Sequence, residues 1–447
     1  MNSSLQVNTS YRDIWKMAYP VIIGSIAVTI LNITDTIYLG RVGEVELGAS
    51  AIGGVFYFVM AMIGIAIGIG TQIQIARRAG EKNESAIGEI FDHSLIIFFV
   101  LSMILFCVLK FLAPFIFRQA LDSDEIIEAS IKFLKYRSFG IFSIMIATSF
   151  RSFYVGIASP RVYGTYSAIM AMVNILLGYM LIFGNFGFPK MGIEGAGIAS
   201  SIAEFVGVVY LFIYTALKKG IKKFRLFRFQ EFKFELISKT LSLSAPLVVQ
   251  NLISMGSWFI FFVFIEKMGQ HSLAISNVVR SAYMVGMTPI WGFSVAANSM
   301  VSNIIGQNKS DEVVSFVKRV IAFALSVSMI MVILTLVFPH ALLNLFTSDQ
   351  QLIEDSMGSL RMVDLAMLFF AFAIVGISSV SGTGATKAAL LIEVAAIVIY
   401  LLYNYIVVFQ FNWKAEAVWF SEVIYWAFTG TASYLYLKTS RWKRIII

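Results

Sequence analysis

Residues 20–40 read PVIIGSIAVTILNITDTIYLG, and residues 246–266 read PLVVQNLISMGSWFIFFVFIE. Both stretches begin with proline and are long enough to cross a bilayer. The same spacing of 226 residues joins further identical pairs without a gap: Gly43 and Gly269, Leu47 and Leu273, Ser50 and Ser276, Gly80 and Gly306, Gly156 and Gly382, and Phe183 and Phe409. One unit of six apolar segments is therefore written twice.

The composition excludes a soluble globular protein. Apolar residues make up 58% of the 447 positions and charged residues 13%, whereas about a quarter of a soluble domain is charged. Apolar segments run over residues 14–39, 50–75, 93–117, 138–157, 162–186, 192–217, 240–265, 272–305, 314–338, 360–383, 387–411 and 415–437. We expect an all-α membrane protein of twelve transmembrane helices, in two parallel six-helix repeats around a central cleft.

The positions of Lys and Arg predict the orientation of the chain. Most of them fall in the termini and in loops on one side of the predicted spans, and positive loops stay in the cytoplasm. We therefore expect a multi-pass protein of the inner (plasma) membrane with both termini cytoplasmic and no cleaved leader. The net charge of +8 then reflects topology and not nucleic-acid binding. The predicted parts are an N-lobe (1–217), a linker (218–239) and a C-lobe (240–447).

The predicted linker carries eight basic residues interleaved with phenylalanines. Such a segment could lie on anionic lipid as an interfacial helix, or it could be a solvated connection whose charge only fixes orientation. The single cysteine, Cys107, excludes an intrachain disulfide.

Two parallel repeats favour secondary transport. Such halves can rock against each other and expose a site near the midplane to either side in turn. The sequence has no phosphate-binding loop for ATP, and its three histidines, His93, His271 and His340, are far apart, so neither an ATP-driven pump nor an enzyme is indicated. We expect no cofactor, a monomer in membrane lipid, and small organic cations as substrates.

Several motifs resemble the multidrug and toxic compound extrusion (MATE) family. They are the first-span pattern with Asn32, Asp35 and Thr36, the paired sequences GIASPRVYG (156–164) and GTGATKAAL (382–390), and NILLGYMLIFGNFGFPKMGIEG (174–195). The resemblance covers nearly the whole chain. It implies twelve helices in two lobes and export of cationic amphiphilic compounds driven by entry of H+ or Na+.

Asp35 is the best candidate for the residue that couples transport to a cation. It lies about 8 Å from the outer end of the first span, at 1.5 Å per residue. A carboxyl group at this depth favours its protonated form, so it could take up a proton outside and release it inside. The resemblance agrees, because prokaryotic members carry their coupling aspartate at this place. The alternative is a structural Asp that caps the helix end.

The rest of the expected coupling set is Asn32, Asn174, Ser200 and Glu204. The family pattern places an aspartate four residues after Asn174, but this chain has Gly178 there. A Na+ site at Asp35, Asn174 and Ser200 would then lack one carboxylate, so we expect H+ in preference to Na+. Glu204, about 18 Å into the sixth span, could compensate through a relay by way of Asn174, or it could be a structurally paired charge.

Other charges within the spans have simpler interpretations. Arg151 could neutralise Glu204 or Asp35. Four residues near predicted span ends, Glu266, Arg280, Asp364 and Glu393, are expected to snorkel or to pair at the surface. The middles of the first and fourth spans of the C-lobe contain no carboxylate, so coupling is expected in the N-lobe, as in DinF-like members of the family.

Helix mechanics and the substrate cleft complete the predictions. Pro20 removes a backbone hydrogen bond and could act as a hinge or as a static kink, and Gly156 and Gly382 are expected to allow close helix contacts.

Aromatic and Met side chains suit flat organic cations. Candidates for the cleft are Tyr38, Tyr57, Met60, Arg151, Met172, Trp258, Met284 and Trp291.

Voltage limits the mechanism, because exchange of one proton for one monovalent cation moves no net charge. With one strong candidate carboxyl, near-neutral exchange is expected. The alternative function is a lipid or oligosaccharide flippase of the same superfamily. Its cleft would need more cations than Arg151 and Arg280 to hold phosphates. A passive channel is a further alternative, which would give Asp35 no reason to titrate.

Overall fold

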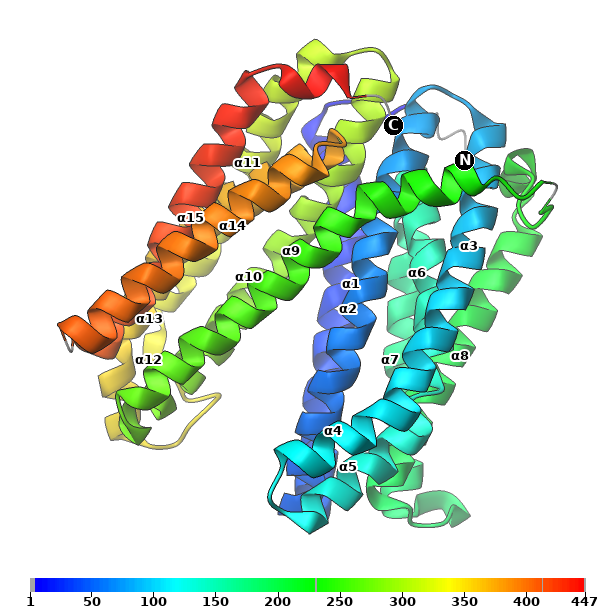
Figure 1. The fold of residues 1–447 in the computed structure, drawn as a ribbon. Coiled ribbons are helices and arrows are strands. Elements are labelled where there is room, and N and C mark those ends of the chain that lie inside the picture. Colours follow the sequence, from blue (N-terminus) through cyan, green and yellow to red (C-terminus); the bar gives the residue numbers. More distant parts are fainter. Residues whose placement is uncertain (1–4, 230, 412, 446–447) are drawn as a thin grey trace. The chain divides into compact units, whose positions relative to one another are not determined.

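The computed structural model describes residues 5–229, 231–411 and 413–445, and these residues form helices joined by short turns, without a strand (Figure 1). The α-helices are α1 (Tyr11–Val42), α2 (Glu44–Gly80), α3 (Glu84–Cys107), α4 (Ala113–Ala120), α5 (Asp124–Arg137), α6 (Gly140–Gly156), α7 (Arg161–Phe183), α8 (Gly192–Leu217), α9 (Phe234–Lys267), α10 (Gln270–Gly306), α11 (Val313–Val337), α12 (Pro339–Leu343), α13 (Gln350–Gly382), α14 (Thr386–Tyr405) and α15 (Ala415–Lys438). Short π- or 3₁₀-helical turns continue or link several of them.

Nine helical stretches of the described chain are long and apolar enough to cross a membrane. The pair α5 and α6 passes the same test as one span bent by 50°. The helices α10, with 37 residues, and α15, with 24, are also long enough to cross but are less apolar. These stretches correspond to the twelve predicted spans, and the predicted fourth span (138–157) corresponds to α6, the second part of the bent pair.

The described chain divides into two units, and two helices belong to both. Among the described residues, unit 1 contains Leu5 and residues 23–244, and unit 2 contains residues 6–22 and 245–445. The first part of α1 therefore packs with unit 2, and the first part of α9 packs with unit 1. Pro20 and Pro246 lie inside these helices, within three residues of the two crossing points. This division differs from the lobes drawn at the sequence repeat, which assign residues 6–22 to the first half.

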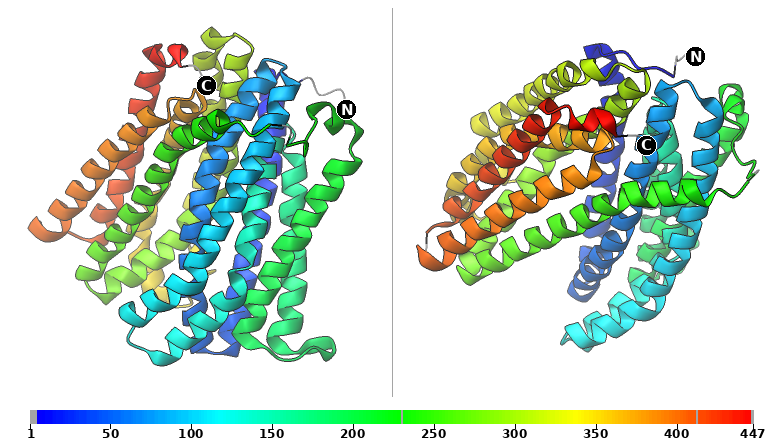
Figure 2. Two further views of the ribbon diagram at one scale, coloured as in Figure 1. Left: turned by 45° about the vertical axis from the view of Figure 1, so that its right-hand side comes forward. Right: turned by 45° about the horizontal axis from the view of Figure 1, so that its top comes forward.

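Within each unit, a repeat-related glycine permits a close helix contact. A Cβ on Gly156 would come within 2.6 Å of Ile75, and a Cβ on Gly382 within 2.4 Å of the Asn298 carbonyl oxygen. The helices α2 and α6 pack together in unit 1, as do α10 and α13 in unit 2. Each unit consists of long helices that lie side by side (Figure 2). The expected role of this glycine pair is confirmed.

The basic linker is folded onto α3, in unit 1. The Asp92 carboxylate accepts hydrogen bonds from the backbone N–H groups of Phe227, Arg228 and Phe229, at 2.7 to 3.1 Å. Positive φ angles at Arg225, Phe227 and Phe229 turn successive N–H groups towards one side, which makes an anion-binding concavity.

Further contacts hold the same segment against α3. Lys223 and Lys233 pair with Glu84 and Glu89 at 2.7 and 2.9 Å. Phe224 is buried in an aromatic cluster with Phe91 and Phe153. Neither a continuous interfacial helix nor a solvated connection describes this segment, because its backbone and several side chains are bound by α3.

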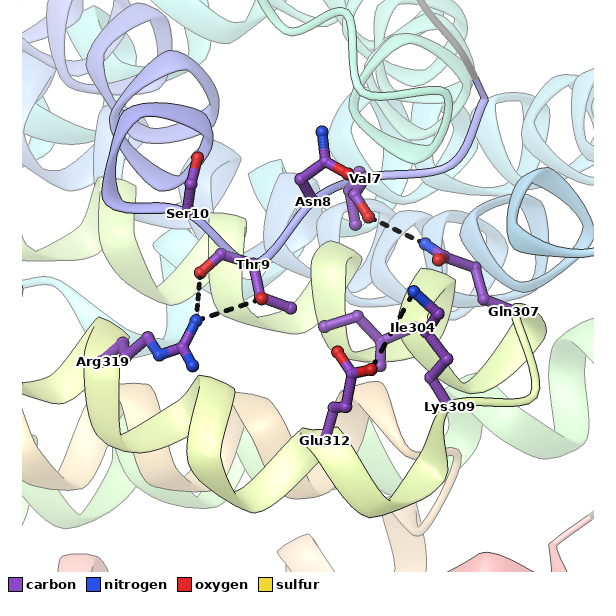
Figure 3. A pocket seen from close by; sticks show the side chains of 9 residues that line it. All are labelled: Val7, Asn8, Thr9, Ser10, Ile304, Gln307, Lys309, Glu312 and Arg319. Atoms are coloured by element: carbon purple, nitrogen blue, oxygen red, sulfur yellow. Dashed lines mark hydrogen bonds and ion pairs between the residues drawn. The ribbon is translucent and has the colours of Figure 1, made fainter.

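In unit 2, residues 7–10 form a strap that lies across α10 and α11 (Figure 3). The Val7 N–H donates to Asn303 Oδ1 at 3.1 Å, and Gln307 Nε2 donates to the Val7 carbonyl oxygen at 2.9 Å. Arg319 Nη1 donates to the Thr9 carbonyl oxygen at 2.9 Å. A cavity of about 240 Å³ remains beneath this strap, lined by Val7, Asn8, Thr9, Ser10, Ile304, Gln307, Lys309, Glu312 and Arg319. The strap therefore fixes the start of α1 to unit 2.

Replacing Asp92 with Ala should detach the linker from α3, because three backbone donors lose a charged acceptor. Hydrogen bonds to a charged group contribute about 1.5–3 kcal/mol each, and we expect a loss of about 3 kcal/mol in total because some donors will find water. Thermal unfolding in detergent and limited proteolysis of residues 218–233 would measure the change. Glu89→Gln, which breaks only an exposed ion pair, is the matched control; equal effects of the two variants would contradict this role for Asp92.

Candidate functional site

The centre of unit 1 contains a buried ion pair between Arg137, the last residue of α5, and Glu204 of α8. Arg137 Nη1 and Nη2 donate to Glu204 Oε2 and Oε1 at 2.9 and 2.6 Å. The Tyr57 hydroxyl of α2 also donates to Glu204 Oε2, at 3.2 Å, and the guanidinium lies 3.6 Å from the centre of the Tyr57 ring. A bidentate pair with a further donor satisfies most of the hydrogen-bonding capacity of the buried carboxylate.

The local sequence explains how Arg137 reaches this position. The helix breaks between α5 and α6, at Ser138 and Phe139, and the bend turns the end of α5 towards α8. The next residue, Gly140, leaves the necessary space, since a Cβ there would lie 2.3 Å from both the guanidinium and the Glu204 carboxylate. The sequence did contain a signal for the position of Arg137: an arginine ends an amphipathic segment, and a glycine follows it closely.

The prediction that Arg151 neutralises Glu204 or Asp35 is therefore wrong, because Arg137 pairs with Glu204 and is the guanidinium near Asp35. Arg151 lies one helix later, on α6, and its guanidinium faces the Tyr163 ring at 5.7 Å. Tyr57, which was expected to line the substrate cleft, is 4% exposed and belongs to the Glu204 site. Of the two interpretations of Glu204, the structure supports the paired charge.

Asp35 lies on the second part of α1, in unit 1, and is half-buried. Its carboxylate neighbours the side-chain amide of Asn174, on α7, and is attracted by the Arg137 guanidinium. The Asn174 amide in turn donates to Ser200 Oγ of α8 at 2.9 Å, while Asn174 Oδ1 is buried and has no hydrogen-bond partner in the described part of the chain. The structure thus joins Asp35, Asn174 and Ser200 in one polar group beside the Arg137–Glu204 pair.

The remaining member of the predicted coupling set, Asn32, does not join this group. Its side chain is exposed one turn before Asp35. Gly178, which stands where the family pattern has aspartate, faces Tyr38 of α1: a Cβ there would lie 3.4 Å from the Tyr38 ring. The tyrosine ring occupies the space next to the position where a second carboxylate would begin.

The site contains few oxygen ligands for a hard cation. Both Glu204 oxygens are occupied by Arg137, so the free oxygens are those of Asp35, Asn174 and Ser200. In the described part of the chain, no group of three His, Cys, Asp or Glu side chains could hold a metal ion. A hard cation prefers several oxygen ligands, preferably charged, and in this group Asp35 is the one carboxylate that Arg137 does not bind through a salt bridge.

The other predicted cleft residues are dispersed over both units. Tyr38 packs against Tyr179 and Phe183 at ring distances of 6.2 and 5.4 Å. Met172, Met284 and Trp291 are exposed, and Met60 is half-buried. Trp258 is bound through its indole N–H to Glu422, a buried residue of α15 that the sequence analysis did not identify.

Unit 2 corrects two predictions about acidic residues. Asp364 and Glu393 are each 4% exposed, so they do not snorkel or pair at the surface. Asp364 accepts a hydrogen bond from Thr335 Oγ1 at 2.5 Å. Their helices, α13 and α14, turn these positions inward, a fact that distance from a span end does not reveal. Glu266 does pair at the surface, with Lys267 at 3.6 Å.

Comparison with protein families matches the MatE model twice, over residues 20–180 and 246–406. The two matches have the same length and are offset by the spacing of the sequence repeat. The chain belongs to the MatE family. This confirms the expected family and membrane-transporter class, whereas the DinF-like branch stays a prediction.

Two relatives of this chain are described as probable multidrug resistance proteins. A probable multidrug resistance protein NorM of Thermotoga maritima is 23% identical over 97% of this chain and 93% of its own length. A probable NorM of Photorhabdus laumondii is 26% identical over 79% of this chain and 77% of that protein.

Solved structures confirm the all-α fold with two repeated lobes. An outward-facing multidrug resistance MATE family transporter of the MOP superfamily superposes with a TM-score of 0.91 at 20% identity, covering 98% of each chain. A MATE transporter in complex with MaL6 superposes with a TM-score of 0.92 at 19% identity, covering all of both chains.

Replacing Arg137 with Met should strongly destabilise unit 1. The variant leaves the Glu204 carboxylate buried without its cation, which typically costs about 3–5 kcal/mol. The double variant Arg137→Met with Glu204→Gln should recover part of this loss because no charge is then buried. Thermal unfolding of the purified protein measures both.

Arg151→Met is the matched control for the single variant. Arg151 faces an aromatic ring and forms no ion pair with any described residue, so its loss should change the free energy of unfolding by about 1 kcal/mol or less. A larger effect at Arg151 than at Arg137 would contradict the assignment of the pair.

Proposed function

We propose that this protein is a secondary active efflux antiporter that exports cationic amphiphilic compounds in exchange for H+, coupled through Asp35 by alternating access. The observation that carries the proposal is the contrast between the two carboxylates of unit 1. Glu204 is bound on both oxygens by Arg137, whereas Asp35 forms no salt bridge among the described residues. The membership of the MatE family and the names of the multidrug resistance relatives support an export function.

Asp35 is half-buried, and the Arg137 guanidinium and the Asn174 amide lie near its carboxyl group. Binding of a proton would weaken the attraction of this region for an organic cation, and loss of the proton would restore it. Competition of this kind is sufficient to couple two opposed fluxes.

The Arg137–Glu204 pair is proposed to be the fixed part of the site. Its charges cancel locally, so its main effect is to hold the guanidinium at a constant place near Asp35. Any effect of Glu204 on coupling is then exerted through Arg137. The relay expected from the sequence, from Asp35 through Asn174 to Glu204, is replaced by a shorter path from Asp35 through Asn174 to Ser200. The proposed location is the inner membrane, with both termini cytoplasmic, and the proposed working form is a monomer.

The test is efflux of tetraphenylphosphonium from proteoliposomes under an imposed inward pH gradient, and separately under an inward Na+ gradient. The wild type is expected to respond to the pH gradient and not to Na+. Asp35→Asn removes the titrating group and should reduce proton-driven efflux at least tenfold. Glu204→Gln should reduce it less, because Arg137 can still contact the amide oxygen.

A control variant separates coupling from general damage. Glu266→Gln removes an exposed carboxylate that pairs only with Lys267 and should transport like the wild type. Efflux driven by Na+ alone would contradict proton coupling. An absence of gradient-driven movement of any tested cation would favour a flippase, and movement without a coupling ion would favour a channel.

A further inference from the structure

Unit 2 contains two buried glutamates that the mechanism above does not use. Glu393 of α14 is 4% exposed and Glu422 of α15 is 1% exposed. Among the described residues, neither forms an ion pair with Lys or Arg. A buried carboxyl group without a cation must be protonated or be stabilised by hydrogen bonds. The surroundings of the two residues satisfy this requirement in different ways.

Glu422 is surrounded by donors. Trp258 Nε1 and the Tyr400 hydroxyl donate to Oε1 at 3.2 and 3.0 Å, and Trp426 Nε1 and the Tyr283 hydroxyl donate to Oε2 at 2.9 and 3.3 Å. An indole N–H can only donate, so each carboxyl oxygen has one partner that requires it to accept. Four donors of this kind can stabilise Glu422 as a carboxylate without a cation.

Glu393 has partners that can reverse their roles. The hydroxyl groups of Ser254, on α9, and Tyr425, on α15, both contact its Oε1, and each hydroxyl can donate or accept. The side-chain amide of Gln250 is a further neighbour, and its Oε1 is buried without a partner. Rotation of this amide would present that oxygen as an acceptor for the O–H of a protonated Glu393. The site therefore fits the acid as well as the carboxylate.

We propose that Glu393 is a second proton-binding residue of this transporter, next to Glu422, which four hydrogen-bond donors bind. Tyr425 links the two sites: its hydroxyl contacts Glu393, and its ring lies 5.5 Å from Tyr400 and 4.5 Å from Trp426, both of which bind Glu422. Gain or loss of the proton at Glu393 reorients the Tyr425 hydroxyl beside the aromatic groups that bind Glu422.

The groups that face Glu393 come from two packed helices and are all uncharged: Gln250 and Ser254 of α9, and Tyr425 of α15. On the other helices of the unit, the Asp364 carboxylate of α13 is bonded to Thr335, and the Arg280 guanidinium of α10 lies 5.1 Å from the Phe262 ring. Neither of them is an ion-pair partner of Glu393. No described Lys or Arg side chain can therefore neutralise Glu393, and a bound proton would do so.

This inference rests on the proposed function and changes its stoichiometry. With protons on both Asp35 and Glu393, exchange for one monovalent cation moves one net charge. A potential of 100 mV then changes the attainable cation gradient by about 50-fold, whereas a one-for-one exchange gains nothing. A pH gradient of one unit supports a cation gradient of about 100-fold with two protons and about tenfold with one.

The experiment measures the steady-state gradient of tetraethylammonium, a hydrophilic monocation that does not equilibrate readily across a protein-free bilayer, in proteoliposomes with a fixed pH gradient and a K+ diffusion potential of 0 or 100 mV that draws protons in their transport direction. The wild type is expected to show the large voltage response, and Glu393→Gln to lose it, with its pH-driven gradient reduced about tenfold. Glu266→Gln is the matched control and should keep the full response.

The outcomes separate this inference from the proposed function. A wild type that uses the pH gradient but ignores voltage overturns the second proton and leaves proton exchange at Asp35 intact. No pH-driven gradient in the wild type overturns both. A full voltage response in Glu393→Gln, or loss of that response in Glu422→Gln alone, places the second proton elsewhere and also overturns the assignment.

A second variant covers the case in which Glu393→Gln does not fold. Tyr425→Phe keeps the carboxyl group and removes one hydroxyl partner, so it should shift the pH at which the voltage response is half-maximal. The same pH dependence in Tyr425→Phe and the wild type would contradict a proton at Glu393.

Discussion

The structure depends on one constraint: a carboxyl group in the low-dielectric interior of a membrane protein must be given a counterion, a complete set of hydrogen bonds or a proton. The three solutions occur at different residues of this chain. Glu204 has Arg137 as its counterion and Glu422 has four hydrogen-bond donors, and we propose that Asp35 uses the proton. The site chemistry follows from this difference, because a residue whose charge is already satisfied cannot couple one flux to another.

The repeated backbone holds different chemistry in its two halves. The last helix of each half carries a buried glutamate, but the two are not equivalent positions, since Glu204 corresponds in the repeat to Gly430, two turns after Glu422. Glycines that permit close helix packing, such as Gly156 and Gly382, do keep the repeat register. Packing positions are thus common to both halves, whereas the charged positions are particular to each.

Much of the fold could be predicted from the sequence, because hydrophobic length and the spacing of the repeat are properties of the chain itself. The candidate site could be predicted only in part. Asp35, Asn174 and Ser200 were recognised by position and by family resemblance, and the structure joins them. Arg137 was missed because it lies at a predicted span end, and only the bend between α5 and α6 brings it to Glu204.

The other failures have the same cause. Glu393 and Glu422 are buried by the rotation of their helices about their axes, and periodicity does not fix that rotation in helices that are apolar on every side. The binding of the linker to α3 was not predicted, because its main partner, the carboxylate of Asp92, lies more than a hundred residues away in the sequence. Side-chain pairing across such separations requires the tertiary structure.

The central claim is that a proton and an organic cation compete through Asp35. The most direct test is the release of protons when tetraphenylphosphonium binds to the purified protein in weakly buffered detergent solution near neutral pH. The account predicts proton release by the wild type and a smaller release by Asp35→Asn. Binding of the cation without any release of protons, or equal release by both proteins, would contradict it.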